Sequence, residues 1–369
     1  MMNKKPPIHC LVPGTKFTVD WHCKVSDEFK HSFLTHAHED HLKGIRSFRS
    51  PRVLHCTSIT AKMLLIKVPN IKNCLSICEV GKPFEVDGVV VNVLDANHTP
   101  GSAMFLFTLK NGEKILFTGD FRAEKSVIQS AKVYSPIKKL FIDCTYAESG
   151  LNIPERKICV DFIISKLKEF LPLGYLAILG TYTIGKEEAI FEIADTLATY
   201  VYAPEARLKS IKDLINSDYR KSEFFTDDLS KARIHLLSIA KCSYEGVLEH
   251  TASLNENKIL VIKLTGWSSG SDWMIPMITE IRGKRIVMFS VPYSDHSSPS
   301  ELIDFVKEMK PISICSITDF TDKAKLKIQK MFLPYLRKEK NKSFIEYYAS
   351  QQSSPEKKYE EENETKIGN

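Results

Sequence analysis

The stretch FLTHAHEDHLKGI, residues 33–45, decides the fold, because it places three histidines and one aspartate within six positions just after a short apolar run. His36 and His38 alternate along an extended segment, so both side chains can point to the same side. Asp40 and His41 follow where the chain must turn into the next element. Neutral imidazoles and carboxylates are the usual ligands of a catalytic zinc. The pattern H-x-H-x-D-H therefore favours a metal site over a solvated, histidine-rich loop.

Four further segments end a β-rich run with a histidine or an aspartate. They are VLDANHTPGS with His98, ILFTGDFR with Asp120, LFIDCTY with Asp143 and VMFSVPYSDHSSP with His296. A single residue of this kind after a strand is usually a turn residue. Five such segments, the first included, indicate that loop residues converge at one rim of a sheet. We therefore expect a composite site drawn from distant parts of the chain.

The composition is that of a globular chain with a large core. The 369 residues are 43% hydrophobic, and this length favours two domains or one domain with a large insertion. No apolar run reaches the roughly 18 residues of a membrane-spanning helix, and MMNKKPPIHCLVPG lacks the apolar region of a signal peptide. Nine unpatterned cysteines predict reduced thiols and a cytosolic or nuclear location. The net charge of +6 is compatible with a polyanionic partner.

Strand and helix signals alternate and predict an α/β chain. The first half contains the short β-rich runs RVLHC, VVVNVLDA, MFLFTL, KILFTGD and KKLFIDC. Residues 155–172 have the apolar spacing of a helix, and SPSELIDFVKEMKP reads as a helix with serine at its cap and proline after its end. Residues 339–369 are polar and highly charged, which predicts a disordered tail.

These motifs carry a resemblance to a known family. H-x-H-x-D-H, DANHTPGS and TGDFR resemble a metallo-β-lactamase hydrolase. TGDFR, DCTY, GTYTIGKE, TGW and PYSDHSS together resemble one branch, the β-CASP DNA nucleases, which is the family of Artemis, Apollo and the interstrand-crosslink-repair exonucleases. The resemblance implies an α/β fold, an αββα metallo-β-lactamase sandwich with an inserted α/β β-CASP cap domain. The expected division is residues 1–150 and 286–338 for the sandwich and 151–285 for the cap.

The resemblance also implies a role for each matching residue. The set expected to hold a first, tightly bound zinc is His36, His38, His98 and Asp120. The set expected to hold a second, weaker metal is Asp40, His41 and the bridging Asp120. Asp143 and His296 match the paired acid and histidine that the family places beside the metal. Asp20 of FTVD matches the first aspartate of the family, which supports the ligand loop.

The implied reaction is hydrolysis of a phosphodiester in DNA. Zinc polarises the phosphoryl oxygen and lowers the pKa of bound water to about 7. We expect the resulting hydroxide, oriented by Asp40, to attack in line, while His296, positioned by Asp143, protonates the departing 3′ oxygen. The expected protein is a nuclear, zinc-dependent 5′→3′ DNA exonuclease that repairs interstrand crosslinks or blocked ends. Basic residues of the cap are expected to guide the strand through phosphate contacts.

The loop GTYTIGKE, residues 180–187, nearly spells a Walker A motif. Glu187 stands where a serine or threonine should bind Mg²⁺. A turn from strand to helix still offers backbone N–H groups and a positive helix end to an anion. ATP binding and a plain turn with a solvated lysine are the alternatives. The resemblance implies that this loop binds the terminal 5′-phosphate of DNA, with Thr183 and Lys186 as donors and Ser102 as a further candidate.

One departure from the family bears on the substrate. RNA-cleaving β-CASP enzymes carry another metal-ligand histidine near the position of Thr318, so its absence favours DNA and predicts a weaker second metal site. His235 is expected to be a satisfied, partly buried histidine. Trp267 of TGW is expected in the core between the domains, with stacking on a base as the alternative. The rival functions are an Artemis-like endonuclease, an RNA-processing nuclease and an inactive DNA-binding scaffold.

Overall fold

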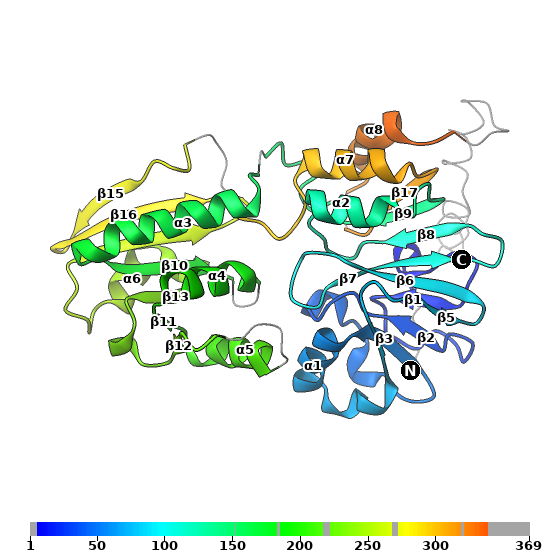
Figure 1. The fold of residues 1–369 in the computed structure, drawn as a ribbon, viewed down its shortest axis with the longest axis horizontal. Coiled ribbons are helices and arrows are strands. Elements are labelled where there is room, and N and C mark those ends of the chain that lie inside the picture. The colour runs from blue at the N-terminus through cyan, green and yellow to red at the C-terminus, as the bar shows by residue number, and fades with distance from the viewer. Residues whose placement is uncertain are drawn as a thin grey trace, which may run out of the picture.

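The computed structural model describes residues 6–151, 153–182, 185–216, 222–267, 272–318 and 321–338. Two lobes lie side by side in Figure 1. One lobe contains the N-terminal part of the chain and the last helices, and the other contains the elements between them in sequence. The expected tail, residues 339–369, lies outside the described residues.

Two sheets form the first lobe. The parallel four-stranded sheet has the order β1-β2-β3-β4. Its strands are β1 (Phe17–Val19), β2 (His31–Phe33), β3 (Val53–Thr57) and β4 (Leu75–Cys78). The mixed six-stranded sheet has the order β17-β9-β8-β7-β6-β5. Its strands are β5 (Phe84–Val86), β6 (Val89–Asp95), β7 (Ala103–Thr108), β8 (Lys114–Phe117), β9 (Lys139–Ile142) and β17 (Ser313–Ser316).

Aromatic side chains hold these two sheets together. Phe17 and Phe33 from the four-stranded sheet interleave with Phe105 and Phe107 from the six-stranded sheet. The rings of Phe33 and Phe107 meet edge to face at 4.9 Å, and none of the four side chains is more than 2% exposed. Each buried phenyl ring removes a large apolar area from water. This packing fixes one sheet against the other, so the loops that follow their strands keep constant relative positions.

Helices cover the outer faces of the sandwich. The helix α1 (Ser58–Lys67) buries Ala61 and Leu64 over the four-stranded sheet. The helices over the six-stranded sheet are α2 (Lys125–Lys132), α7 (Pro299–Met309) and α8 (Asp322–Phe332). The expected start of α7 is confirmed, because Ser298 and Glu301 form a reciprocal capping box there. The layers therefore follow the expected order of helix, sheet, sheet and helix.

The second lobe is an α/β domain inserted between β9 and α7. Its sheet has the order β12-β11-β13-β10-β14-β16-β15, with only β15 antiparallel among the described strands. The strands are β10 (Leu176–Thr181), β11 (Val201–Tyr202), β12 (Phe225–Thr226), β13 (Ile234–Ser238), β14 (Lys258–Leu264), β15 (Met277–Ile281) and β16 (Lys284–Val291). The helices are α3 (Arg156–Phe170), α4 (Glu187–Leu197), α5 (Glu205–Asn216) and α6 (Tyr244–His250). The first three share one hydrophobic core and α6 belongs to another.

The pairing of β16 places the end of the inserted domain later in the chain than expected. Residues 285–291 of this strand pair with β14, and residues 284–288 pair with β15 on the other side. The insertion therefore ends after β16 and not at residue 285, because an apolar run alone does not reveal which sheet it joins. All nine cysteines lie in described segments, and none of them forms a disulfide there. Among the described helices, none is long and apolar enough to cross a membrane.

Candidate metal centre

The ligand loop after β2 is held by Asp20. The carboxylate of Asp20 accepts hydrogen bonds from the backbone N–H of Thr35 at 2.8 Å and from its hydroxyl at 2.7 Å. Nδ1 of His41 also donates to this carboxylate, at 2.8 Å. The loop between Thr35 and His41 contains His36 and His38. Asp20 therefore fixes both ends of the segment that carries the first histidines.

The first candidate group of metal ligands is His36, His38, His98 and Asp120, whose ligand atoms lie within 4.8 Å of one another. His36 is fully buried, and its Nε2 has no hydrogen-bond partner among the described residues. This nitrogen lies 3.7 Å from Oδ2 of Asp120. A buried polar atom without a partner is costly unless a ligand satisfies it. Three imidazoles and one carboxylate that converge in this way fit a divalent cation of the zinc type.

The protonation states of this group suit metal binding. Burial lowers the pKa of His36 well below its usual value, and burial together with His296 lowers the pKa of His98 to about 4. Burial also lowers the pKa of His38. Burial alone would raise the pKa of Asp120, but His41 holds it well below its usual range. Neutral imidazoles and an ionised carboxylate are the forms that coordinate a metal.

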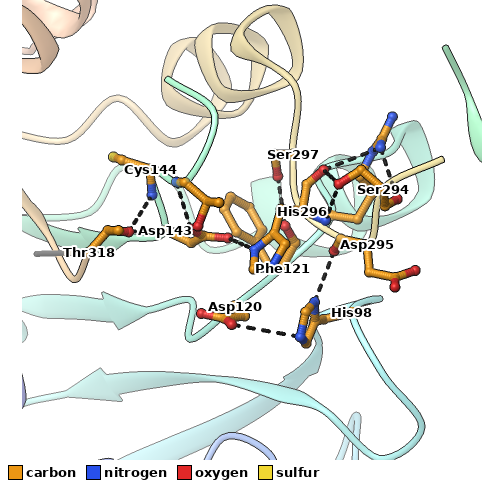
Figure 2. A network of polar contacts seen from close by, with 12 residues as sticks. His98, Asp120, Phe121, Asp143, Cys144, Ser294, Asp295, His296, Ser297 and Thr318 are labelled. Atoms are coloured by element: carbon orange, nitrogen blue, oxygen red, sulfur yellow. Dashed lines mark hydrogen bonds and ion pairs between the residues drawn. The ribbon is translucent and has the colours of Figure 1, made fainter. Parts of the chain in front are cut away.

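His98 is oriented by a residue nearly two hundred positions later in the chain. Its Nδ1 donates to the carbonyl oxygen of Asp295 at 3.0 Å, which leaves Nε2 facing Asp120 (Figure 2). Ser102 holds the turn that carries His98, because its Oγ accepts from the N–H groups of His98 and Thr99 at 3.1 and 3.2 Å. Ser102 is 2% exposed. The structure therefore gives Ser102 a role in the turn and does not support the expected contact with phosphate.

The second candidate group is Asp40, His41 and Asp120. Nε2 of His41 lies 3.4 Å from Oδ1 of Asp120 and 3.6 Å from Oδ2 of Asp40, whose side chain is 78% exposed. The two oxygens of Asp120 thus face different groups, as a bridging ligand requires. Burial would lower the pKa of His41, but Asp20 and Asp120 raise it well above its usual value. A cation bound here must displace a proton, which favours weaker binding.

Asp143 and His296 form a third group with Asp120. Nδ1 of His296 donates to Oδ2 of Asp143 at 2.8 Å (Figure 2). Oδ1 of Asp143 accepts from the N–H and the hydroxyl of Thr145 at 2.9 and 2.6 Å. Burial alone would lower the pKa of His296, but the Asp143 carboxylate raises it to about 9. In the metal-free protein His296 is therefore protonated at neutral pH, and the proton on Nε2 points away from Asp143.

Thr318 occupies the position where RNA-cleaving relatives are expected to carry a histidine. Its hydroxyl accepts from the N–H of Cys144 at 3.2 Å and donates to Oδ1 of Asp143 at 3.4 Å (Figure 2). The side chain thus adds a neutral hydrogen bond to Asp143 where an imidazole would add a metal ligand. This arrangement agrees with the expectation of fewer ligands for a second metal.

The loop GTYTIGKE is closed by its own side chains. Oε1 of Glu187 accepts from the N–H of Gly185 at 2.8 Å and from Nη1 of Arg207 at 2.7 Å. Glu187 is 3% exposed. A buried carboxylate, itself paired with Arg207, therefore takes a loop N–H group that a phosphate would need. These contacts argue against ATP at the described part of the loop; the expected donor Thr183 lies outside the described residues.

Lys186 faces the interior of the protein. The side chain is 4% exposed, and Nζ donates to the carbonyl oxygen of Tyr293 at 2.9 Å. The backbone N–H of Lys186 donates to Oδ2 of Asp295 at 3.2 Å. The expected phosphate contact of Lys186 is thus not supported, because its ammonium group is committed to the segment before His296. Sequence reasoning could not see this, since a loop lysine is ordinarily solvated.

Asp295 is a site residue that sequence reasoning missed. Its carbonyl oxygen orients His98, and its carboxylate receives the N–H of Lys186 and lies 3.9 Å from Nη1 of Arg156. It joins the inserted lobe to the candidate ligands. Its signal was its place in PYSDHSS, directly before His296.

Arg122 of TGDFR holds the segment that carries Ser294 and His296. It is fully buried, and its Nε donates to Oε1 of Glu301 at 3.0 Å. Its Nη1 donates to the carbonyl oxygens of Ser294 and His296 at 3.0 and 3.2 Å, and Nη2 donates to that of Pro154 at 3.0 Å. One guanidinium group therefore connects the six-stranded sheet, the start of α7 and the segment that carries His296.

A cleft of about 620 Å³ lies apart from the candidate ligands, against α3, α4 and the start of α7. Its charged lining is mainly acidic and consists of Glu124, Glu155, Glu188, Glu192, Glu301 and Asp304 against Lys125, Arg156 and Lys157. Such a lining repels a polyanion. The cleft is therefore unsuited to a nucleic-acid strand.

The fold and the site define a class of protein, a two-sheet α/β sandwich with a composite candidate metal centre and an inserted domain. Residues 219–322 match the family model described as DNA repair metallo-beta-lactamase. The chain is 33% identical over 324 residues to the human DNA cross-link repair 1A protein, covering 85% of this chain and 30% of that protein. It is 30% identical over 314 residues to the 5′ exonuclease Apollo of Gallus gallus, covering 83% of this chain and 63% of that protein.

A solved structure shares the fold. The crystal structure of a protein of unknown function from Enterococcus faecalis V583 aligns with a TM-score of 0.54 at 12% identity and covers 79% of this chain and 76% of that chain.

The chain belongs to the metallo-β-lactamase and β-CASP family, in the branch of the DNA cross-link repair and Apollo proteins. It spans about a third of the length of the DNA cross-link repair 1A proteins that it matches.

Proposed function

We propose that this protein is a zinc-dependent 5′→3′ DNA exonuclease that works in DNA repair, on interstrand crosslinks or blocked ends, in the nucleus. One observation carries the proposal: candidate metal ligands converge on Asp120 in three groups, and in the first of them the buried Nε2 of His36 has no hydrogen-bond partner among the described residues. The direction of cleavage is supported by relatives whose names describe 5′ exonucleases. A second, weaker metal at Asp40 and His41 forms part of the proposal.

The metal and the chain have separate tasks in this reaction. The residues that would hold the cation are His36, His38, His98 and Asp120. A zinc ion there supplies Lewis-acid chemistry and an activated water at neutral pH. Asp40, exposed at the open side of the centre, accepts a proton from the attacking water and orients it toward phosphorus. Its exposure leaves room for a DNA strand.

His296 is the general acid of the proposed mechanism. Because Nδ1–H is held by Asp143, the proton at Nε2 is directed away from that carboxylate and can pass to the departing 3′ oxygen. The phosphorus–oxygen bond to this 3′ oxygen breaks as the water oxygen bonds to phosphorus. The released nucleotide keeps its own 5′-phosphate and gains a 3′-hydroxyl, and the remaining strand carries a new 5′-phosphate.

The decisive test is digestion of end-labelled DNA and RNA, single- and double-stranded, with and without a 5′-phosphate. Stepwise release of mononucleotides from phosphorylated 5′ ends of DNA is the expected result. Internal cuts would replace the proposal with an Artemis-like endonuclease, and a preference for RNA would replace it with an RNA-processing nuclease. Metal analysis of the purified protein by plasma mass spectrometry identifies the cation, and a metal other than zinc would refute that part.

The variant Asp40→Asn tests the assignment of the base. Its side chain is largely exposed and has the same shape, so we expect normal folding and a loss of nuclease turnover on the order of 10²-fold or more. Circular dichroism and thermal unfolding check the fold. Near-normal turnover by this variant would contradict the mechanism. A protein that binds metal and DNA without any turnover would instead be an inactive scaffold.

A further inference from the structure

The tripeptide TGW, residues 265–267, has a geometry that explains its residue types. The hydroxyl of Thr265 accepts from the backbone N–H of Trp267 at 3.2 Å, which closes a tight turn after β14. A Cβ atom at Gly266 would lie 2.1 Å from the hydroxyl of Tyr146 and 3.3 Å from Cβ of Ser294. Only glycine lets the turn pass this close to Tyr146. The turn therefore places the indole of Trp267 on Tyr146, with their ring centroids 5.0 Å apart at 63°.

The Trp267–Tyr146 pair lies next to His296, the proposed general acid. Tyr146 is 5% exposed, and its ring meets the imidazole of His296 at 6.0 Å and 77°. The hydroxyl of Ser294 also accepts from the backbone N–H of His296 at 2.9 Å. Trp267 is thus separated from His296 by a single, well-packed aromatic ring. Its position relative to the reacting groups is fixed by contacts with both lobes.

The indole itself faces solvent. Trp267 is 62% exposed, which corrects the expectation that it fills the core between the domains. By comparison, Trp21 is 5% exposed, and Trp273 packs against the core of the inserted lobe. What sets Trp267 apart from other exposed apolar side chains is its place, because it packs on Tyr146, whose ring in turn contacts His296. Its edge is supported by Tyr146 while the rest of the ring remains accessible.

We propose that Trp267 is a stacking platform for the terminal nucleobase of the DNA strand that is being cleaved. This inference rests on the proposed nuclease function. His296 protonates the 3′ oxygen of the departing nucleotide, so an aromatic ring beside His296 lies on the side of that nucleotide. Every base has a π-face, so stacking holds the terminal nucleotide without reading its sequence.

The first test compares Trp267→Ala with the wild type on three single-stranded, 5′-phosphorylated oligonucleotides. One carries a base at every nucleotide (the fully based strand). One is abasic at the 5′-terminal nucleotide, and one is abasic at an internal nucleotide far from that end. On the fully based strand we expect kcat/KM of the first cleavage to fall by about 5- to 150-fold. On the terminally abasic strand, kcat/KM of the wild type should already be lower by a similar factor. On that strand the variant should cleave as fast as the wild type. The internally abasic strand should behave like the fully based strand.

Two further variants separate stacking from general damage. Trp267→Phe retains an aromatic face and should recover most of the lost activity. Tyr200→Ala removes another exposed aromatic residue of the same lobe, whose ring contacts Phe224, and should leave kcat/KM unchanged. Thermal unfolding of every variant checks the fold. If Trp267→Ala loses as much activity on the terminally abasic strand as on the fully based strand, stacking is refuted.

A binding measurement makes the platform testable without turnover. In the Asp40→Asn background, a phosphorylated oligonucleotide should quench the tryptophan fluorescence, because a base stacks on the exposed indole. The terminally abasic strand should quench it much less, and Trp267→Phe should abolish the difference between the two strands. Equal quenching by both strands would overturn the inference. A wild type that releases no nucleotide from any DNA would refute the proposed nuclease while this measurement still decides the platform.

Discussion

Replacement of Arg122 by methionine should destabilise the protein strongly and disable its site. The guanidinium group is fully buried and donates to Glu301 and to three backbone carbonyls. Methionine fills much of the volume but donates no hydrogen bond, so Glu301 and the carbonyls lose their partner in the interior. Breaking a buried ion pair from one side costs roughly 3–5 kcal/mol. In a lobe of this size, the midpoint of thermal unfolding should then fall on the order of 10 °C.

The loss should reach the chemistry as well as the fold. Two of the three carbonyls belong to Ser294 and His296, so the segment that carries the proposed general acid loses its support. A displacement of about 1 Å in a catalytic group can reduce turnover by about 10²-fold. Arg122→Lys keeps the charge, but one ammonium group lacks the planar fork that reaches all four acceptors. We therefore expect an intermediate loss of both stability and turnover.

The assay is urea and thermal unfolding followed by circular dichroism, paired with single-turnover cleavage below the unfolding transition. The matched control is Arg233→Met, because Arg233 pairs with Glu256 at the surface with a side chain that is 44% exposed. An exposed pair of this kind contributes at most about 1 kcal/mol. If Arg122→Met destabilises the protein no more than Arg233→Met, the buried Arg122 network does not hold the segment that carries His296.

Three more outcomes follow from the candidate centre. In the metal-free protein, the pKa of His296 is raised from 6.5 to about 9, so its stabilising effect is complete below pH 6.5 and is lost as the pH rises through 9, roughly 3 kcal/mol in all. Asp143→Asn should remove that part of the slope of unfolding free energy against pH, and an unchanged slope would contradict the assignment. Asp20→Asn, which weakens the support of His41 and of the loop that carries His36 and His38, should lower the affinity of the second metal by about 10- to 100-fold in calorimetric titration. Chelation should lower the unfolding midpoint, because metal at about 100 times its Kd contributes about 2.7 kcal/mol; scanning fluorimetry with and without zinc detects this, and equal midpoints would refute a metal held by the folded state.

Much of the site could be predicted from the order of residue types along the chain. Each predicted ligand follows the end of a strand or a short turn, and the structure brings them all within one cluster, with Asp120 common to three groups. The cap of α7 at Ser298 and the pairing of Asp143 with His296 agree with the sequence motifs. His235 is buried and bonded to His250, as expected for a satisfied histidine. These features follow from residue types in motifs, which the sequence reveals.

The predictions that the structure does not support concern the surroundings of single side chains. Lys186 and Ser102 were predicted to be phosphate donors because loop lysines and serines usually face water. In the structure, Lys186 instead donates to the carbonyl oxygen of Tyr293, and Ser102 accepts from the backbone N–H of His98. Trp267 looked like a core residue because tryptophan is usually buried, yet Gly266 directs it outward onto Tyr146. Exposure depends on what packs nearby in space, and spacing along the chain does not contain that information.

The sequence by itself determined the chemistry of this protein: which side chains can bind a metal, which pair can move a proton, and which strands and turns carry them. Only the tertiary structure decided the surroundings that give those groups their properties. It buried His36, linked His98 to Asp295, and turned Lys186 inward while leaving Trp267 in solvent. The physical reason is that coordinating atoms are a property of residue types, whereas burial, pKa and access depend on contacts between segments far apart in the chain.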